Sequence, residues 1–336
     1  KTKDADLGYT FGQPIITRKA DGTWVVLVTS GYNNASPGSG RGYLYVLNAA
    51  TGAIISKIST GVGDTTTPSG LAKISAFNLE TVGNKAGFVY GGDLLGNVWR
   101  FDINSPLDAS GGGGSGTGAV LKFATLLSPS GIAQPITTTP VLGNVAGKNV
   151  VFIGTGKYLE TSDLSNTQRQ TQYAIKDDGA TTTLLNARAS LVQQTLSNTT
   201  SNTRTSSEAT VDFLSQRGWY FDFPDTGERV NIDSQLVQGV LLIPSIVPSN
   251  TACTPGGYGW LNFVDYKTGT AVTTTAGTKS DSPIVGVNVL YIEGKPIVSL
   301  VTSNKPTPSQ PSIQPDFFGT SSGFTGKRVI WRELIP

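Results

Sequence analysis

The sequence of 336 residues predicts an all-β fold, and three observations support this prediction. Short runs of β-branched and aromatic residues alternate with clusters of Gly, Pro, Asn and Asp along the whole chain, a pattern typical of strands joined by turns. Helical periodicity is nearly absent, and the single predicted helix covers Glu208 to Gln216. The third observation is a hairpin that recurs along the chain.

The recurring hairpin consists of an apolar strand, a turn of small residues, and an alternating strand that ends in Asp or Asn. The final residue suits a turn because its short side chain can cap the backbone that follows. The four copies cover residues 24–31 with 42–48, 87–93 with 96–102, 150–156 with 173–177, and 239–243 with 260–265. Thr51-Gly52 follows the first copy and Thr268-Gly269 follows the fourth, each ahead of another β run.

A further strand precedes several hairpins. These predicted inner strands cover residues 13–18, 71–77, 134–142 and 284–292, and residues 295–301 open a fifth unit. A repeated four-stranded sheet is the pattern of β-propeller blades, which stack around an axis because no blade buries both faces alone. We therefore expect residues 1–336 to form one propeller-type region, all or part of a modified β-propeller, with about four to five four-stranded antiparallel blades. Loop insertions are expected near residues 105–118 and 186–208.

The composition excludes several classes of protein. Charged residues make up 14% of the chain, well below the roughly 25% of an average soluble protein, and the net charge is only +2. Without a clustered basic patch, binding to nucleic acid is not expected. No apolar stretch reaches the ~20 residues of a membrane span. Methionine is absent and the N-terminus does not resemble a signal peptide, so we expect a mature or internal fragment, the C-terminal part of a longer protein.

The sequence predicts no catalytic residue, no cofactor-binding residue and no metal ligand. Histidine is absent, which excludes Ser-His-Asp and Cys-His catalytic sites from this chain, together with His-ligated metals. Cys253 is the only cysteine, so no disulfide can form within the chain. It is either a half-buried free thiol or the partner of a cysteine elsewhere in a longer protein.

Four short stretches resemble known catalytic or ligand-binding sequence motifs. Asp225-Thr226-Gly227 spells the aspartic protease signature, but that chemistry needs two carboxylates, so we predict a hairpin turn. Gly111 to Gly116 fits G-x-G-x-x-G without a following helix, which predicts a flexible loop. Gly143 to Asn149 falls one residue short of a phosphate loop and reads as a hairpin turn. Asp4 to Gly8 begins like a calcium loop but lacks further acidic ligands, which predicts a solvated turn.

Aromatic residues in the predicted strands allow two interpretations. They could form a sugar-binding platform, but alternating aromatic residues in strands more commonly pack between sheets, and we expect that role here. The residues concerned are Tyr43, Tyr45, Trp99, Phe101, Trp219 and Tyr220.

Several stretches resemble the C-terminal domain of the PilC/PilY family of type IV pilus tip proteins. They are residues 6–14, 90–102, 151–159, 218–229 and 327–334, and they occur in the family order from end to end. The resemblance implies a propeller exported to the cell surface and carried at the pilus tip. There it would dock on minor pilins, promote pilus biogenesis, oppose retraction and contribute to adhesion. Contact with host or abiotic surfaces would occur through the full-length protein, whose adhesive, von Willebrand A-like half precedes the propeller.

The resemblance also raises the question of calcium, which some family members bind in a loop just before the Tyr-x-Gly-Asp-Leu segment. The equivalent stretch, residues 77–87, offers one carboxylate, Glu80, and places Lys85 among the ligand positions. Calcium takes roughly six to eight oxygen ligands, so the sequence predicts no calcium at this loop and no other cofactor.

Two other functions remain open beside the non-catalytic tip protein. One is a carbohydrate-binding propeller lectin. The other is a quinoprotein-like dehydrogenase propeller, which would need calcium-binding carboxylates and a catalytic Asp in one cluster. No such cluster is visible in the sequence, and we therefore predict that the chain is not an enzyme.

Overall fold

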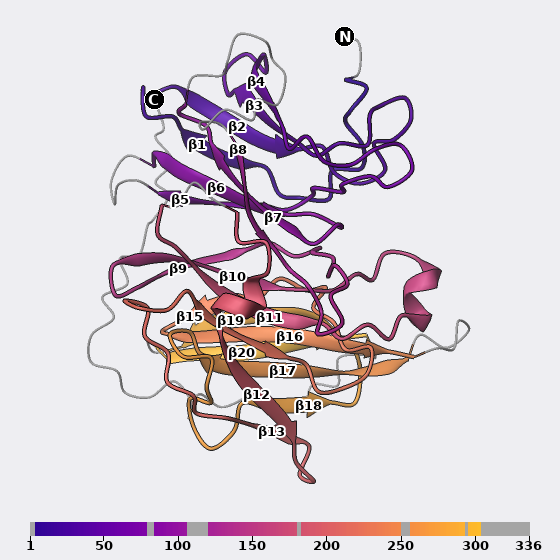
Figure 1. Ribbon diagram of the computed structural model, residues 1–336, viewed down its shortest axis with the longest axis vertical. Helices are drawn as coiled ribbons and strands as arrows, with labels where there is room; N and C mark the ends of the chain where they lie inside the picture. The colour runs from indigo at the N-terminus through magenta and orange to yellow at the C-terminus, as the bar shows by residue number, and fades with distance from the viewer. Residues whose placement is uncertain are drawn as a thin grey trace.

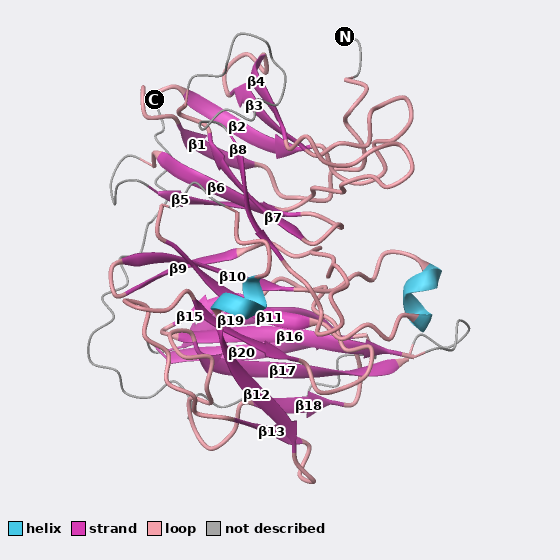
Figure 2. Ribbon diagram, in the orientation of Figure 1, coloured by secondary structure: helices cyan, strands magenta, loops and turns pink. Residues whose placement is uncertain are grey.

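The structure is a computed structural model that describes residues 4–78, 84–105, 120–179, 183–249, 256–292 and 295–303. Strands dominate these ranges (Figure 2), which confirms the all-β prediction. The only helical elements in them are two single 3-10 turns, η1 (Thr161–Ser165) and η2 (Ala187–Ser190). No described helix is long and apolar enough to cross a membrane.

The first two blades are separate four-stranded antiparallel sheets in which consecutive strands are neighbours. The first contains β1 (Ile15–Arg18), β2 (Trp24–Thr29), β3 (Tyr43–Asn48) and β4 (Ile54–Ser59). The second contains β5 (Ile74–Asn78), β6 (Ala86–Gly92), β7 (Asn97–Asp102) and β8 (Val120–Thr125). Both central hairpins coincide with the copies predicted from sequence.

The third and fourth blades belong to one sheet of ten strands. The third contains β9 (Val141–Val145), β10 (Lys148–Gly154), β11 (Thr171–Asp177) and β14 (Gly218–Asp222). The fourth contains β15 (Gln235–Val237), β16 (Val240–Pro248), β17 (Gly257–Asp265) and β18 (Gly277–Ser280). A fifth unit, β19 (Ile284–Ile292) with β20 (Lys295–Thr302), forms a two-stranded sheet. Figure 1 shows the blades stacked one on the next along the long axis of the molecule.

A hairpin joins the outer edges of the third and fourth blades. It consists of β12 (Val192–Asn198) and β13 (Thr203–Ser206). β12 pairs in parallel with β14, and β13 pairs antiparallel with β18. The stretch 186–208, expected as a loop insertion, lies between β11 and β14 but is not an irregular loop, because η2, β12 and β13 take up four, seven and four of its residues. The insertion predicted at 105–118 falls almost wholly on residues outside the described ranges.

Apolar side chains fill the space between each pair of consecutive blades. Val25, Leu27 and Val46 of the first blade meet Val89 and Phe101 of the second in one buried cluster. Equivalent clusters lie between the second and third blades, the third and fourth, and the fourth and β19–β20. Four interfaces join five units, as expected if each sheet needs its neighbours to bury both faces.

Main-chain hydrogen bonds also link the blades, at one edge of the propeller. We call this edge the N-terminal rim, because it carries residues 4–14 together with the β2–β3, β6–β7, β10–β11 and β14–β15 connections. Gly31 N–H donates to Leu71 C=O at 2.8 Å, Ile136 N–H to Asp93 C=O at 3.0 Å, and Val230 N–H to Thr155 C=O at 3.0 Å. Each bond joins the second connection of one blade to the segment that leads into the next. We call this set of three equivalent hydrogen bonds between consecutive blades the blade relay.

The repeated Thr-Gly turns have the same structure in the first and fourth blades. The Asn48 side chain accepts the N–H groups of residues 50 and 51, and the Asp265 side chain accepts those of residues 267 and 268. In the fourth blade the indole of Trp219, from β14 of the third blade, lies directly over Gly269.

Two sequence predictions of secondary structure are wrong. Residues 208–216 form no helix, because the buried Gln194 side chain binds both main-chain groups of Ala209 and the Asp212 carboxylate caps a single turn at Leu214. The inner strand predicted over residues 134–142 begins only at Val141. Its first part is irregular because Ile136 takes part in the blade relay.

Candidate functional site

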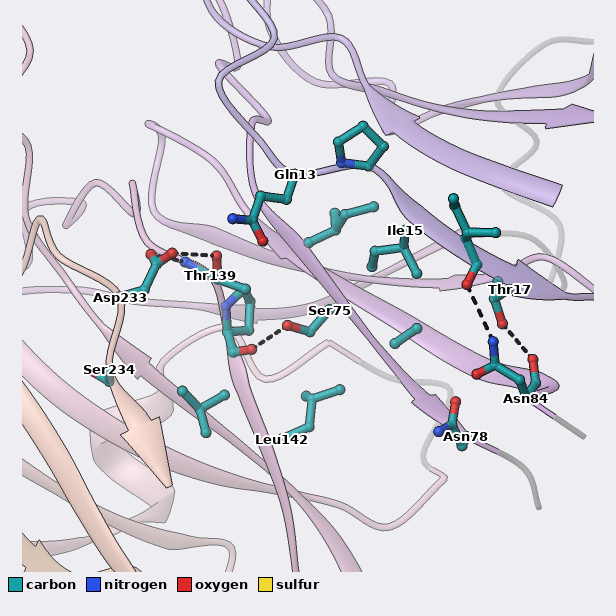
Figure 3. Close-up of a pocket in the computed structure, with 16 residues that line it drawn as sticks. Gln13, Ile15, Thr17, Ser75, Asn78, Asn84, Thr139, Leu142, Asp233 and Ser234 are labelled. Carbon is teal, nitrogen blue, oxygen red and sulfur yellow. Dashed lines mark hydrogen bonds between the residues drawn. The ribbon is translucent and has the colours of Figure 1, made fainter. Parts of the chain in front are cut away.

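A cavity of about 510 Å³ lies where the innermost strands of the first three blades meet, and we call it the axial cavity. Figure 3 shows its lining, which comes mainly from β1, β5, β9 and the segment before β15. The apolar lining residues are Pro14, Ile15, Ile16, Ile74, Ala76, Pro140, Val141 and Leu142. The polar ones are Gln13, Thr17, Ser75, Asn78, Asn84, Thr139, Asp233 and Ser234. No Phe, Tyr or Trp is among them.

Three of the polar residues occupy equivalent positions in their blades. Gln13, Thr139 and Asp233 each stand two residues before the first strand of a blade. Asp233 is the only charged residue in the described part of the lining, and its charge is balanced by Lys73, whose Nζ lies 2.8 Å away. Asp233 also accepts hydrogen bonds from the main-chain N–H of Thr139 at 2.9 Å and from its hydroxyl at 3.0 Å. The mouth of the cavity is therefore polar but carries no net charge.

Asn84 closes the far side of the cavity by binding the edge of β1. Its C=O accepts the Thr17 hydroxyl at 2.8 Å and the Arg18 N–H at 3.0 Å, and its side-chain amide donates to Ile16 C=O at 3.4 Å. Asn84 has a φ of 52°, in the left-handed region that asparagine tolerates better than most residues. An edge strand that would otherwise present unpaired groups is covered at this point.

Hydrogen-bonding capacity remains unused inside the cavity. Within the described part of the chain, the carboxamides of Gln13 and Asn78 make no hydrogen bond. The hydroxyl of Ser234 is buried and also without a partner in those ranges. Gln13 and Asn78 are exposed, so water satisfies their carboxamides and a ligand can reach them, whereas the buried hydroxyl of Ser234 lacks the partner that buried polar groups normally find.

Exposed aromatic and aliphatic side chains lie on the N-terminal rim. Tyr9 is 60% exposed and Phe11 68% exposed, and the ring of Phe11 lies 6.0 Å from that of the buried Tyr32. Two main-chain hydrogen bonds between Tyr9 and Tyr32 fix this segment on the first blade. Burial, with a smaller effect of the Asp233 charge, raises the pKa of Tyr32 to about 12, so the ring stays neutral.

A second part of the rim is held from beneath by Arg229. This buried guanidinium donates to the main-chain carbonyls of Lys157 at 3.0 Å, Asp163 at 2.7 Å and Asn166 at 2.6 Å. The loop that it fixes presents Tyr158 and Leu159, which are 39% and 50% exposed. Rigid loops that display large apolar side chains are suited to binding a protein partner, because little conformational entropy is lost on association.

The lookalike motifs within the described ranges have structural roles. Glu228 N–H donates to Asp225 C=O at 3.2 Å, so Asp225-Thr226-Gly227 is a turn as predicted, but it lies in the connection between β14 and β15 and not in a hairpin. Burial alone would raise the pKa of Asp225, but hydrogen bonds from Trp260, Asn198 and Tyr258 bring it below its usual value. Residues 143–149 form the turn of the β9–β10 hairpin, as predicted.

The turn at Asp4 to Gly8 is present but is not solvated as predicted. Lys57 Nζ lies 2.9 Å from Asp4 Oδ1 and 2.7 Å from Asp6 Oδ2, so one lysine binds both carboxylates. The same ammonium group lies 4.5 Å from the ring centre of Tyr43 and 5.4 Å from that of Tyr45. This cluster was not predicted from the sequence, because Lys57 belongs to β4 and lies far from Asp4 and Asp6 along the chain.

Five of the six aromatic residues considered as a sugar platform are buried, namely Tyr45, Trp99, Phe101, Trp219 and Tyr220. Tyr43 is half-buried under Lys57. Trp99, Phe101, Trp219 and Tyr220 pack between blades as predicted, whereas Tyr45 packs with Lys57 and Asp4 on the first blade. The other predicted features, Glu80 of the calcium-loop equivalent, the segment 111–116 and Cys253, lie outside the described residues. Within the described ranges no three Cys, Asp or Glu side chains gather in a way that could hold a metal ion.

Comparisons with known proteins agree on one family. The family model of the PilY1 β-propeller domain matches residues 1–209. A type IV pilus biogenesis factor PilY1 homolog of Xylella fastidiosa is 30% identical over 80% of this chain and 19% of its own length. The PilY1 of Pseudomonas aeruginosa strain PAO1 is 31% identical over 80% of this chain and 26% of its own length.

The chain thus spans about a fifth to a quarter of the length of these relatives. Among solved structures, the crystal structure of the Pseudomonas aeruginosa PilY1 C-terminal domain superimposes with a TM-score of 0.71 and 26% sequence identity. The match covers 90% of this chain and 72% of that one.

Proposed function

The chain belongs to the PilY1 β-propeller family, and on this premise we propose that it is the propeller of a type IV pilus biogenesis factor. In this proposal the propeller acts at the pilus tip, outside the cell, as a non-catalytic scaffold that docks on minor pilins. Through that contact it supports pilus assembly, opposes retraction and contributes to adhesion. The observation that carries the proposal is the match of the family model over more than half of the chain, together with the five-unit propeller that the structure describes.

The N-terminal rim is the surface that we propose for docking. Tyr9, Phe11, Tyr158 and Leu159 are exposed there on segments that hydrogen bonds hold rigid. Aromatic side chains at the centre of a contact supply most of the binding energy of a typical protein interface. A rim built this way suits a partner that must stay bound under pulling force.

The biological test counts surface pili by electron microscopy in cells that lack the propeller segment, with and without the retraction motor. We expect pili to be lost when the motor is present and to return when it is removed. Pilus numbers unchanged in both strains would contradict a role in biogenesis.

A finer test changes only the rim. The double variant Tyr9→Ser and Phe11→Ser should reduce pilus number in the presence of the motor while the protein is still made and exported. Leu214→Ser is the matched control, because Leu214 is 74% exposed but lies in the connection that leads into β14, at the opposite end of the blade. An equal loss of pili in both variants would count against the rim as the docking surface.

A further inference from the structure

We propose that the axial cavity binds a short, uncharged, extended peptide segment that carries aliphatic side chains. The lining residues alone select this ligand, whatever role the propeller has at the pilus.

Charged ligands are disfavoured by the electrostatics of the cavity. Among the described lining residues the one carboxylate, Asp233, is already bound by Lys73 at 2.8 Å and by two groups of Thr139. A phosphate or carboxylate ligand would have to compete with Asp233 for Lys73, and a cation would have to compete with Lys73 for Asp233. Either ligand would also lose its hydration on entering, without a new charge partner.

Sugars and nucleobases are disfavoured because no aromatic residue is among the lining residues that the structure describes. Pyranose rings and bases gain much of their binding energy by lying against an aromatic face, and the apolar lining here is entirely aliphatic or proline. A ligand that fits should therefore place aliphatic groups, not flat rings, against Ile15, Ile74 and Leu142.

Peptide groups match the hydrogen-bonding capacity that remains. The unpartnered carboxamides of Gln13 and Asn78 each offer two N–H donors and a carbonyl acceptor, as a peptide needs for its own C=O and N–H groups. Ser234 adds a hydroxyl that can donate or accept. The aliphatic residues Ile15 and Ile74 begin their strands, one or two residues after the polar mouth, and Asn78 stands at the far end of β5.

The cavity therefore presents polar, apolar and again polar lining in succession. An extended chain rises about 3.3 Å per residue, so a segment of a few residues has the length to place main-chain amides at both polar ends and aliphatic side chains between them. The volume of about 510 Å³ lies within the usual range of small-ligand sites, so the segment would comprise a few residues and not a folded domain.

The test titrates the purified chain with three capped tetrapeptides and with maltotriose, followed by nuclear magnetic resonance and calorimetry. The peptides are acetyl-Thr-Val-Thr-Val-amide, acetyl-Asp-Val-Asp-Val-amide and acetyl-Lys-Val-Lys-Val-amide. We expect saturable binding of the neutral peptide, with at least about tenfold weaker binding of both charged peptides and of maltotriose. This comparison uses the unchanged protein, so it does not depend on whether a variant folds.

A double variant of the cavity tests whether the neutral peptide binds there. Gln13→Leu with Asn78→Leu removes the unpartnered carboxamides and should weaken binding of the neutral peptide by about tenfold or more. Gln193→Leu makes the same chemical change on β12, outside the cavity, and should leave binding unchanged. The proposal is overturned if no peptide binds, if maltotriose or a charged peptide binds best, or if the cavity variant binds as tightly as the control.

Discussion

Arg204 and Glu228 form an ion pair with no exposed surface: Nη1 lies 2.7 Å from Oε1 and Nη2 lies 2.7 Å from Oε2. Arg204 belongs to β13 of the hairpin between the third and fourth blades, and Glu228 to the segment that leads into the fourth. Asn262 of β17 accepts a further hydrogen bond from Arg204 at 2.6 Å, and the guanidinium lies 3.8 Å from the ring centre of Trp260. The hairpin is therefore held to the fourth blade by side chains as well as by strand pairing.

Glu228→Gln should destabilise the protein by about 3–5 kcal/mol, because it leaves the buried Arg204 charge without its main partner. The double variant Arg204→Met with Glu228→Leu should lose less, since both buried charges are then removed together. Urea unfolding followed by circular dichroism measures both values. Asp21→Asn, in the exposed Lys19–Asp21 pair, is the control and should shift the midpoint far less. Equal shifts for Glu228→Gln and Asp21→Asn would refute a stabilising role for the buried pair.

Gly269→Ala should cost more stability than Gly52→Ala, although both glycines close the same Thr-Gly turn. Their φ angles are 71° and 69°, so the backbone strain of an alanine, about 1–2 kcal/mol, is common to both. A Cβ at Gly52 would meet nothing within 4 Å, whereas a Cβ at Gly269 would lie 2.5 Å from the ring of Trp219. We expect a further loss of about 1–3 kcal/mol at Gly269, measured by urea unfolding of the two variants. Matching losses would mean that Trp219 does not pack tightly on this turn.

Lys57→Gln should lower the melting temperature at neutral pH but not in strong acid. Burial alone would raise the pKa values of Asp4 and Asp6, but the hydrogen bonds and charge of Lys57, together with hydrogen bonds from nearby main-chain N–H groups, Tyr45 and Ser39, bring both below the ordinary value of 3.8. Carboxylates with lowered pKa values stabilise the fold fully above pH 3.8, and this contribution disappears as the pH falls through the lowered values. The difference between wild type and variant should therefore be constant above about pH 5 and shrink toward about pH 2. A difference that persists undiminished in acid would exclude this origin.

Adding calcium, or removing it with a chelator, should leave the melting temperature of this chain unchanged. The stretch equivalent to the family's calcium loop holds the single carboxylate Glu80 together with Lys85, which cannot supply the oxygen ligands that the ion takes. Differential scanning fluorimetry with millimolar calcium, with magnesium as the control ion, measures the effect. A calcium-specific rise in melting temperature would show that a site exists despite this sequence.

The sequence was sufficient to predict the hairpins of the first four blades, because their strands alternate strongly and end in a capping residue. Asn48 and Asp265 do cap the turns as their positions suggested. The β12–β13 hairpin was missed because its strands are rich in Gln, Ser and Thr and its partners, β14 and β18, are distant in sequence.

The candidate site was not predictable by the same means. The axial cavity combines Gln13, Asn78 and Ser234 from three segments, none of which forms a motif, and only the stacking of blades brings them together. The sequence holds one weak signal for the cavity, a polar residue two positions before the first strand in three of the blades. This signal can be recognised only if the starts of those strands are known, and the predicted start of β9 was wrong.

The blade relay has a consequence for how such a chain can change over time. Its three bonds involve only peptide groups, and peptide groups are the same whichever side chain a residue carries, proline's missing N–H excepted. Gly31 is an exception, because its φ is 73° and a Cβ there would lie 2.1 Å from the Tyr9 carbonyl oxygen. Elsewhere around these bonds, substitutions can accumulate while consecutive blades keep their spacing. The connections outside the relay can lengthen or shorten, and the rim can acquire new surface residues, on a frame whose geometry does not depend on them.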